Sequence, residues 1–299
     1  MKVYKYVSPA LLSVLQDWLV RFTQAIEFND PFEMRPHISR IASDELLNRK
    51  AEEGFEGYVL RTYNHMPFAV RRKISSGEFM RHHLKDKIKY LEQYKAQVIE
   101  GALPEAKARA ERMINENIGV FCVAERPDDL LMWAHYADGH RGFVLEFDAD
   151  AEFFHQQDPP EWVSEDEEGT KAFREEYGLL RPVQYSSSRP SIILMEPENF
   201  NHLYMKSDHW AYEREHRMLM PLSYAVQRIE RSARPPVCLF PLPPSAVTRI
   251  LLGCNMHSDH QRRVLELLSR CNGASHTKVE HAYLDDERFE LLFRPLLRT

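Results

Sequence analysis

Polar and aromatic side chains suited to catalysis or ligand binding are concentrated in three short segments of the sequence. The first carries amide and acidic residues around a proline, the second gathers aromatic rings and histidines, and the third alternates glutamates with basic residues. These segments are 29–33, 133–142 and 210–217. Such side chains can transfer protons, bind polar ligands or form ion pairs, so the elements that position them decide which chemistry is available.

The third segment carries two glutamates separated by one residue. On a strand, Glu213, Glu215 and Arg217 would point to one face, whereas on a helix Glu213 and Arg217 would form an i, i+4 ion pair. An apolar run follows at 218–220, which predicts a helix-to-strand junction near Glu213. Two carboxylates on one face raise one pKa, which suits a general base or a group that binds ribose hydroxyls. A structural salt-bridge lattice with Lys206 and Arg217 is an equally good interpretation.

The second segment is expected to begin as a short helix over 128–137. Trp133, Tyr136 and His140 would share one helical face, which favours a ligand-binding role for all three. His135 and His140 do not have the i, i+4 spacing that places two metal ligands on one face, and no metal site is predicted. A general acid–base or hydrogen-bonding role is expected for His135, although the alternative of two structural histidines stays open.

The first segment is rich in residues that form turns. Pro31 biases Asp30 away from helical backbone, and Asn and Asp side chains bond to nearby backbone groups. One interpretation is a rigid loop that presents Asn29, Asp30 and Glu33 into a cleft. The other, favoured by these residues taken alone, is a capped turn held by two buried phenylalanines.

The composition indicates an ordinary folded chain. Its 299 residues are 43% hydrophobic and 28% charged, with a formal net charge of -6, which argues against a chain that coats nucleic acid along its whole length. Four cysteines form no CxxC pair, so neither a disulfide framework nor a zinc site is indicated. No signal peptide or membrane-length apolar run is recognised, and the expectation is a cytoplasmic protein without a membrane partner.

Helical patterns are grouped early in the chain and strand patterns late, which predicts an α+β fold. We expect a mixed, mostly antiparallel sheet in a single domain over 1–299, with a large helical insertion at about 39–117. The acidic stretch 151–178 is expected to be a loop. Expected strands are 3–7, 20–26, 118–124, 143–147, 181–185, 216–222, 237–240, 248–252 and 278–284, and expected helices outside the insertion are 128–137, with Asp128 as N-cap, and 258–270.

The insertion combines one apolar helical face with a basic middle part. The apolar positions of that face are Leu84, Ile88, Leu91 and Val98. The basic stretch 71–89 is interpreted as a solvated helix surface, and the alternative is a face that contacts phosphates or a partner.

These segments together resemble a bacterial family known only as a domain of unknown function, number 2971 in its series (DUF2971). The resemblance covers most of the chain, with 39–117 as its most variable part, and it implies no settled activity. The matching pieces are Lys5-Tyr6, 28–33, 131–133, 135–137, His140, Gly142, 146–148, Lys206, Trp210, Tyr212-Glu213, Glu215 and Arg217.

One function is suggested by a second resemblance. Glu213-Arg214-Glu215 is similar to the Glu-x-Glu strand of one branch of the ADP-ribosyltransferases, enzymes that use NAD. This resemblance implies that Glu215 binds the nicotinamide ribose and stabilises an oxocarbenium-like transition state, while Tyr136 or Trp133 stacks on nicotinamide. It also implies a place in bacterial defence or toxin systems.

The match to that branch is incomplete. The serines at 186–188 are weakly similar to its serine-threonine-serine strand. No arginine occupies an early strand, and Lys5 or Tyr6 would have to replace it.

Two further classes of function stay open. A nucleic-acid enzyme or sensor would contact phosphates through 71–89 and hold a divalent ion with Asp30, Glu33 and Glu213. A non-catalytic binding module would use the polar cluster only as structural support. The sequence leaves the small-molecule or nucleotide ligand and the oligomeric state undetermined.

Overall fold

A computed structural model describes residues 1–161, 163–196 and 200–296, with the backbone alone described at 98–100 and 172. The backbone groups into two compact units. Unit 1 comprises Met1–Arg35, Met113–Arg189 and Phe200–Thr299, and unit 2 comprises Pro36–Arg112 and Pro190–Asn199. Unit 2 therefore holds most of the predicted helical insertion, while the single domain over 1–299 stays a prediction.

Unit 1 is built on an eight-stranded sheet with the order β15-β14-β13-β5-β1-β4-β10-β6. Neighbouring strands are antiparallel except β13 and β14, which are parallel. With 44% helix and 26% strand, the predicted α+β class with a mixed, mostly antiparallel sheet is confirmed. In sheet order the strands are Leu291–Pro295, Lys278–Leu284, Val247–Leu252, Phe143–Asp148, Lys2–Val7, Ile118–Ala124, Glu215–Pro221 and Leu180–Pro182.

Two small sheets complete the strands of unit 1. One has the order β11-β12-β2 and the other pairs β7 with β9 in parallel. Their strands are Gln227–Ile229 (β11), Val237–Pro241 (β12), Leu19–Phe22 (β2), Gln184–Ser186 (β7) and Met205–Ser207 (β9).

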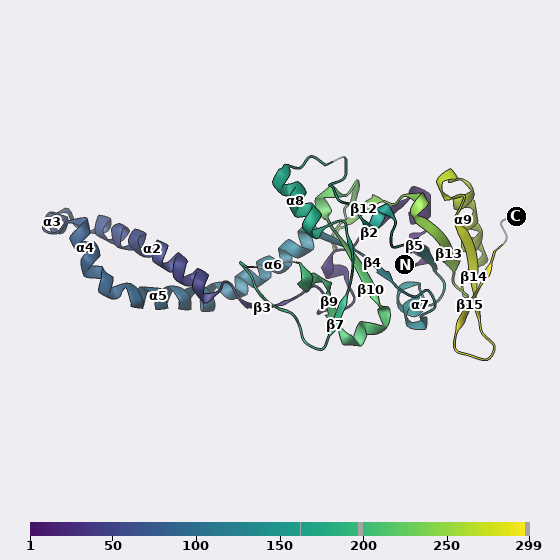
Figure 1. Cartoon of the computed structure of the whole chain (residues 1–299), viewed down its shortest axis with the longest axis horizontal. Coiled ribbons are helices and arrows are strands. Elements are labelled where there is room, and N and C mark those ends of the chain that lie inside the picture. The colour runs from purple at the N-terminus through teal and green to yellow at the C-terminus, as the bar shows by residue number, and fades with distance from the viewer. Residues whose placement is uncertain (162, 197–199, 297–299) are drawn as a thin grey trace. The chain divides into compact units, whose positions relative to one another are not determined.

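The α-helices are distributed over both units (Figure 1). In unit 1, α9 lies beside β14 at one end of the main sheet (Figure 1). The helices are α1 Ser13–Asp17, α2 Asp44–His65, α3 Phe68–Arg71, α4 Ser76–His83, α5 Lys87–Ala96, α6 Leu103–Asn117, α7 Leu130–Tyr136, α8 Glu167–Glu176 and α9 Ser258–Ser269.

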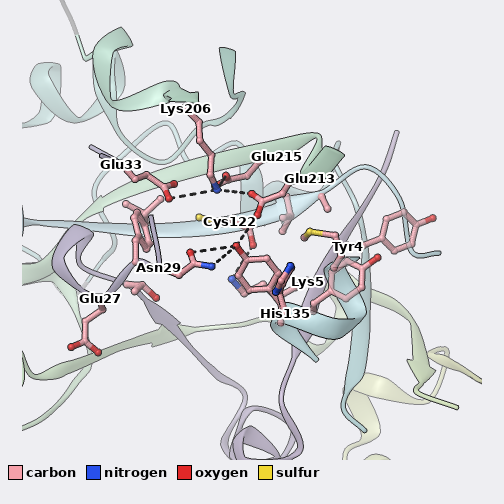
Figure 2. A pocket seen from close by; sticks show the side chains of 18 residues that line it. Tyr4, Lys5, Glu27, Asn29, Glu33, Cys122, His135, Lys206, Glu213 and Glu215 are labelled. Carbon is pink, nitrogen blue, oxygen red and sulfur yellow. Dashed lines mark hydrogen bonds and ion pairs between the residues drawn. The ribbon is translucent and has the colours of Figure 1, made fainter. Parts of the chain in front are cut away.

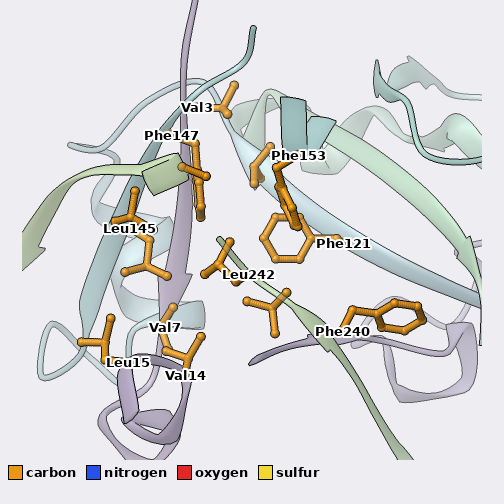
Figure 3. Packing of buried hydrophobic residues seen from close by; sticks show 14 of the residues in the cluster. Val3, Val7, Val14, Leu15, Phe121, Leu145, Phe147, Phe153, Phe240 and Leu242 are labelled. Carbon is orange, nitrogen blue, oxygen red and sulfur yellow. The ribbon is translucent and has the colours of Figure 1, made fainter. Parts of the chain in front are cut away.

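The main sheet separates two apolar clusters. Side chains alternate between the faces of a strand, so Val3 and Val7 of β1 enter the larger cluster, where Figure 3 shows them with Phe121 of β4. Tyr4 and Tyr6 point to the smaller cluster, which contains the α7 residue Trp133. This alternation fixes β1 in the centre of the fold with both faces covered.

The two central strands β1 and β4 are joined at one position only. β1 pairs with β5 from Lys2 to Val7, but its register with β4 is the single pair Tyr4 and Ala124. Away from this pair, β4 is bridged to Thr23 instead, through Val120. The sheet therefore opens between β1 and β4, and both strands contribute side chains to the pocket described below.

Unit 2 contains helices α2 to α5 together with the parallel strands β3 (His37–Arg40) and β8 (Ser191–Ile193). Its apolar cluster is formed by Phe55, Val59 and Phe79. The predicted apolar face through Leu84 and Ile88 is wrong, because these side chains are 55% and 71% exposed. The cause is a break in the helix, since α4 ends at His83 and a 3-10 turn over Leu84–Asp86 precedes α5.

Three local predictions are corrected by the structure. The stretch 151–178 is not all loop, because Asp166 caps α8 by accepting a hydrogen bond from the Gly169 amide at 2.8 Å. The N-cap of α7 is Asp129, not Asp128; its Oδ1 accepts from two amides at 2.9 and 3.0 Å. The expected strand 20–26 ends with β2 at Phe22 and gives way to a 3-10 turn.

Within the described ranges, no helix is both long enough and apolar enough to cross a lipid bilayer.

Candidate functional site

A pocket of about 330 Å³ lies in unit 1 beside the opening between β1 and β4. Figure 2 shows Glu33, Lys206, Glu213 and Glu215 grouped on one side of it, with Lys5 and His135 across from them. Of the residues predicted for the site, those that line the pocket are Asn29, His135, Tyr136, Lys206, Glu213 and Glu215.

The two glutamates of the third segment converge because the backbone changes direction between them. A 3-10 helix over Asp208–Glu213 ends there, Arg214 takes a left-handed conformation with φ 45°, and β10 begins at Glu215. The predicted helix-to-strand junction near Glu213 is thereby confirmed. Since Glu215 and Arg217 are two residues apart on β10, their side chains leave the strand on the same face.

Lys206 and Arg217 tie three glutamates into one buried network. Lys206 Nζ lies 2.5 Å from Glu213 Oε2, 3.0 Å from Glu215 Oε2 and 3.5 Å from Glu33 Oε2. Arg217 donates from Nε to Glu215 Oε1 at 2.7 Å and also bonds Glu33 through its guanidinium. All five side chains are at most 7% exposed, so these ion pairs are shielded from solvent.

The network has three carboxylates and only two cations, and this imbalance spreads the pKa values of the acids. Burial raises the pKa of Glu33 to about 7, because Arg217 and Lys206 only partly offset the loss of hydration. Burial also raises the pKa of Glu213, against the pull of Lys206. At Glu215, burial is outweighed by Arg217 and Lys206, which hold its pKa well below the usual range. One carboxyl group can therefore exchange a proton near neutral pH.

Tyr136 connects α7 to this network. Its hydroxyl donates to Glu213 Oε1 at 2.7 Å and accepts from Asn29 Nδ2 at 3.3 Å. Burial and the nearby carboxylate of Glu213 raise the pKa of Tyr136, so the phenol keeps its proton and remains a donor. His135, the next side chain on α7, is exposed and lines the pocket.

The other predicted residues of α7 and its following turn lie outside the pocket. Trp133 is fully buried, and its indole nitrogen donates to the Pro127 carbonyl at 2.7 Å. His140 stacks on Trp133 with ring centroids 6.1 Å apart, but α7 ends at Tyr136. The expected common face is therefore split, because only Tyr136 faces the pocket.

The 29–33 loop combines features of both interpretations. Asp30 is buried and accepts from the Phe32 amide at 2.9 Å, as in a capped turn, and it does not line the pocket. Asn29 and Glu33 do line it. The expectation of two buried phenylalanines is wrong, because Phe32 is 61% exposed.

A cation site is not indicated by the arrangement of acidic groups. Among the described residues, no group of three or more His, Cys, Asp or Glu side chains is placed to hold a metal ion. The metal set proposed from sequence is dispersed, since Asp30 lies off the pocket while Glu33 and Glu213 pair with cations of the chain.

Two pocket residues, Lys5 and Glu33, are missing from the predicted catalytic and ligand-binding residues. The sequence marks Lys5 as unusual, because it lies between Val3 and Val7 at a strand position where the alternating pattern predicts an apolar side chain. Glu33 is expected from sequence in a loop that presents it into a cleft or in a metal site, and it lines the pocket. The serines at 186–188 are not among the residues that line the pocket.

Comparison with known proteins identifies one family. Residues 132–218 match the model of a family described as "Protein of unknown function (DUF2971)", so the predicted resemblance is confirmed over this stretch, which is shorter than expected. No curated protein and no solved structure matches the chain. The matched stretch contains His135, Tyr136, Lys206, Glu213 and Glu215. The similarity of the chain to the family of unknown function DUF2971 therefore spans residues 132–218.

Proposed function

We propose that the pocket is the active site of an ADP-ribosyltransferase-like enzyme that acts on the N-glycosidic bond of NAD. The observation that carries this proposal is the excess of acidic over basic groups in the buried network, with three glutamates against Lys206 and Arg217. Such a network provides buried negative charge beside the pocket.

Fixed negative charge is what glycosidic cleavage requires. Breaking the bond between ribose and nicotinamide passes through an oxocarbenium-like transition state that carries positive charge. Groups already oriented towards that charge stabilise it without reorganisation. The ion pairs with Lys206 and Arg217 hold the carboxylates in place before a substrate binds.

Within the network, the geometry favours Glu213 as the group that meets the substrate. Glu215 accepts three hydrogen bonds from Arg217 and Lys206 at 2.7 to 3.1 Å, and two of them converge on Oε2. Glu213 is bound by Lys206 on one oxygen and by Tyr136 on the other, and each oxygen retains a second lone pair. Trp133 is buried away from the pocket, so the aromatic surface for nicotinamide would come from Tyr136 or Phe28.

The test is release of nicotinamide from NAD by the purified chain. We expect Glu213→Gln to reduce the rate by about 10²- to 10³-fold, the usual effect of removing one group that stabilises charge. Glu146→Gln is the matched control, because Glu146 is a buried glutamate paired with Arg249 and does not line the pocket. No release of nicotinamide in the presence of candidate protein and nucleic-acid acceptors would refute the proposal.

A second candidate function, nucleic-acid binding, is favoured by the surface of unit 2. The basic residues of 71–89 that are exposed there are Arg72, Lys73, Arg81, His82, Lys85 and Lys89. Phosphate contacts release counterions, so binding of DNA or RNA would weaken steeply with salt. Exchange of Lys85 and Lys89 to glutamine should reduce the salt slope by about 2, and absence of binding at low salt would remove this candidate.

A further inference from the structure

Lys5 is the polar exception in an apolar row of β1. Its neighbours on the same face, Val3 and Val7, are buried in the larger cluster, and its Nζ lies 4.8 Å from the centroid of the Phe121 ring. A lysine in such a row removes apolar contacts and costs hydration. A lysine at this position therefore indicates a role that a valine could not perform.

No ion pair joins Lys5 to a carboxylate in the described part of the chain. Its one hydrogen bond runs from Nζ to the Cys122 carbonyl at 2.9 Å, across the opening between β1 and β4. With one N–H group bonded to this carbonyl, a neutral amine keeps its second N–H group and its lone pair for a molecule in the pocket that Lys5 lines. Four glutamates line the same pocket, but three of them pair with Lys206 and Glu27 pairs with Arg21 and Arg231.

The surroundings of Lys5 favour its neutral form. Burial lowers the pKa of Lys5; Cys122 and Glu215 oppose this shift, while the positive charge of Arg21 adds to it. A lysine amine desolvated in this way is the form that acts as a nucleophile towards carbonyl groups.

From this placement we propose that Lys5 is a reactive amine that condenses with the carbonyl group of a small hydroxylated aldehyde or ketone bound in the pocket. The carbonyl would lie at Lys5, and the hydroxyls would face the acceptor-rich side formed by Asn29, Glu33 and Glu213. This inference goes beyond the proposed reaction on NAD and does not depend on it.

The condensation balances without a further reactant. The amine attacks the carbonyl carbon, a C–N bond forms, and the oxygen takes a proton while the nitrogen loses one. The resulting carbinolamine then loses water as the C=N bond forms. Glu33, whose pKa is about 7, lines the same pocket and can exchange these protons directly or through water.

Reductive trapping tests the proposal. The full chain is treated at pH 7 with limiting glyceraldehyde and cyanoborohydride, and the modified lysines are identified by peptide mass spectrometry. We expect Lys5 to be modified at least about tenfold faster than Lys2, because each pKa unit by which an amine falls raises its neutral fraction tenfold. Lys2 is an internal reference on the same strand, since it is exposed and paired with Asp148.

Three arms complete the experiment. Lys5→Arg should abolish the fast adduct, whereas Lys2→Arg should leave it unchanged. Propanal, which lacks the hydroxyls, should modify Lys5 more slowly than glyceraldehyde does. Equal rates would contradict the claim that the pocket binds the hydroxyl groups of the ligand. A rate at Lys5 equal to or below that at Lys2 overturns the proposal, and this comparison uses only the wild-type chain. Nicotinamide release is measured separately, so trapping without release refutes only the NAD proposal, and release without trapping refutes only this one.

Discussion

Two lysines line the same pocket, and their surroundings give them opposite chemistry. Burial alone would lower the pKa of Lys206, but the attraction of Glu215, Glu33 and Glu213 outweighs it and raises the pKa. Lys5 contacts a backbone carbonyl and an aromatic ring instead, and burial lowers its pKa. One lysine therefore serves as a permanent counter-ion, while the other keeps an amine available to a ligand.

The comparison shows that a charged side chain in a pocket need not belong to the chemistry of the pocket. Lys206 has each carboxylate of the network within 3.5 Å, so its contribution is expected in stability. Lys5 has no such partner in the described part of the chain, so its contribution is expected in reactivity. Substitutions that separate stability from reactivity therefore decide whether the contrast is real.

The largest expected effect is that of Lys206→Met. Removing this ammonium leaves Arg217 to pair with Glu33 and Glu215 and takes away the cation that pairs with Glu213, and breaking one side of a buried pair typically costs about 3–5 kcal/mol. We expect a loss of this size in the free energy of unfolding, measured with urea. Lys2→Met, at an exposed ion pair, should change stability by less than about 1 kcal/mol. A similar small loss at Lys206 would contradict its role as a structural counter-ion.

An intermediate effect is expected from the pH dependence of the network. Burial raises the pKa of Glu33 to about 7 in the folded chain, from its ordinary value of 4.5. A carboxyl group whose pKa is higher in the folded chain stabilises the fold at pH values below its pKa in the unfolded chain. That contribution is lost as the pH rises through its pKa in the folded chain. Between about pH 4.5 and 7, wild type should therefore lose stability on the order of 2 kcal/mol from this group.

Glu33→Gln provides the control for this pH dependence, because glutamine imitates the protonated acid and cannot titrate. The free energy of unfolding of this variant, measured with urea across the same pH range, should lack the Glu33 contribution. If the free energy of unfolding depends on pH identically in wild type and variant, Glu33 is not the carboxyl group that titrates near neutral pH.

The smallest expected effect on stability is that of Lys5→Met. Methionine is apolar and similar in length, so it should pack beside Val3 and Val7. It loses the bond to the Cys122 carbonyl, a contribution of about 1 kcal/mol. We therefore expect a change within about 1 kcal/mol of wild type in urea unfolding. A loss as large as that at Lys206 would show that Lys5 is structural and would remove the contrast between the two lysines.

Local patterns predicted much of the framework of unit 1. The apolar run after Glu215 correctly indicated β10, and the late cluster of strands indicated the mostly antiparallel sheet. The sequence patterns failed where two alternative local backbone structures have similar free energies. The acidic stretch that contains α8 has few apolar residues to mark a helix, and the face through Leu84 and Ile88 was interrupted by a turn.

The sequence by itself determined which segments carry Glu33, Glu213 and Glu215 and that 3–7 and 118–124 form strands, because alternation and turn chemistry act between near neighbours. Only the tertiary structure decided the partner of each charge. Glu33 and Arg217 are 184 residues apart in sequence and meet in the buried network, while Lys5 pairs with no carboxylate of the described residues. Coulomb energy and hydration depend on distances through space, so the pKa of a lysine is raised at position 206 and lowered at position 5.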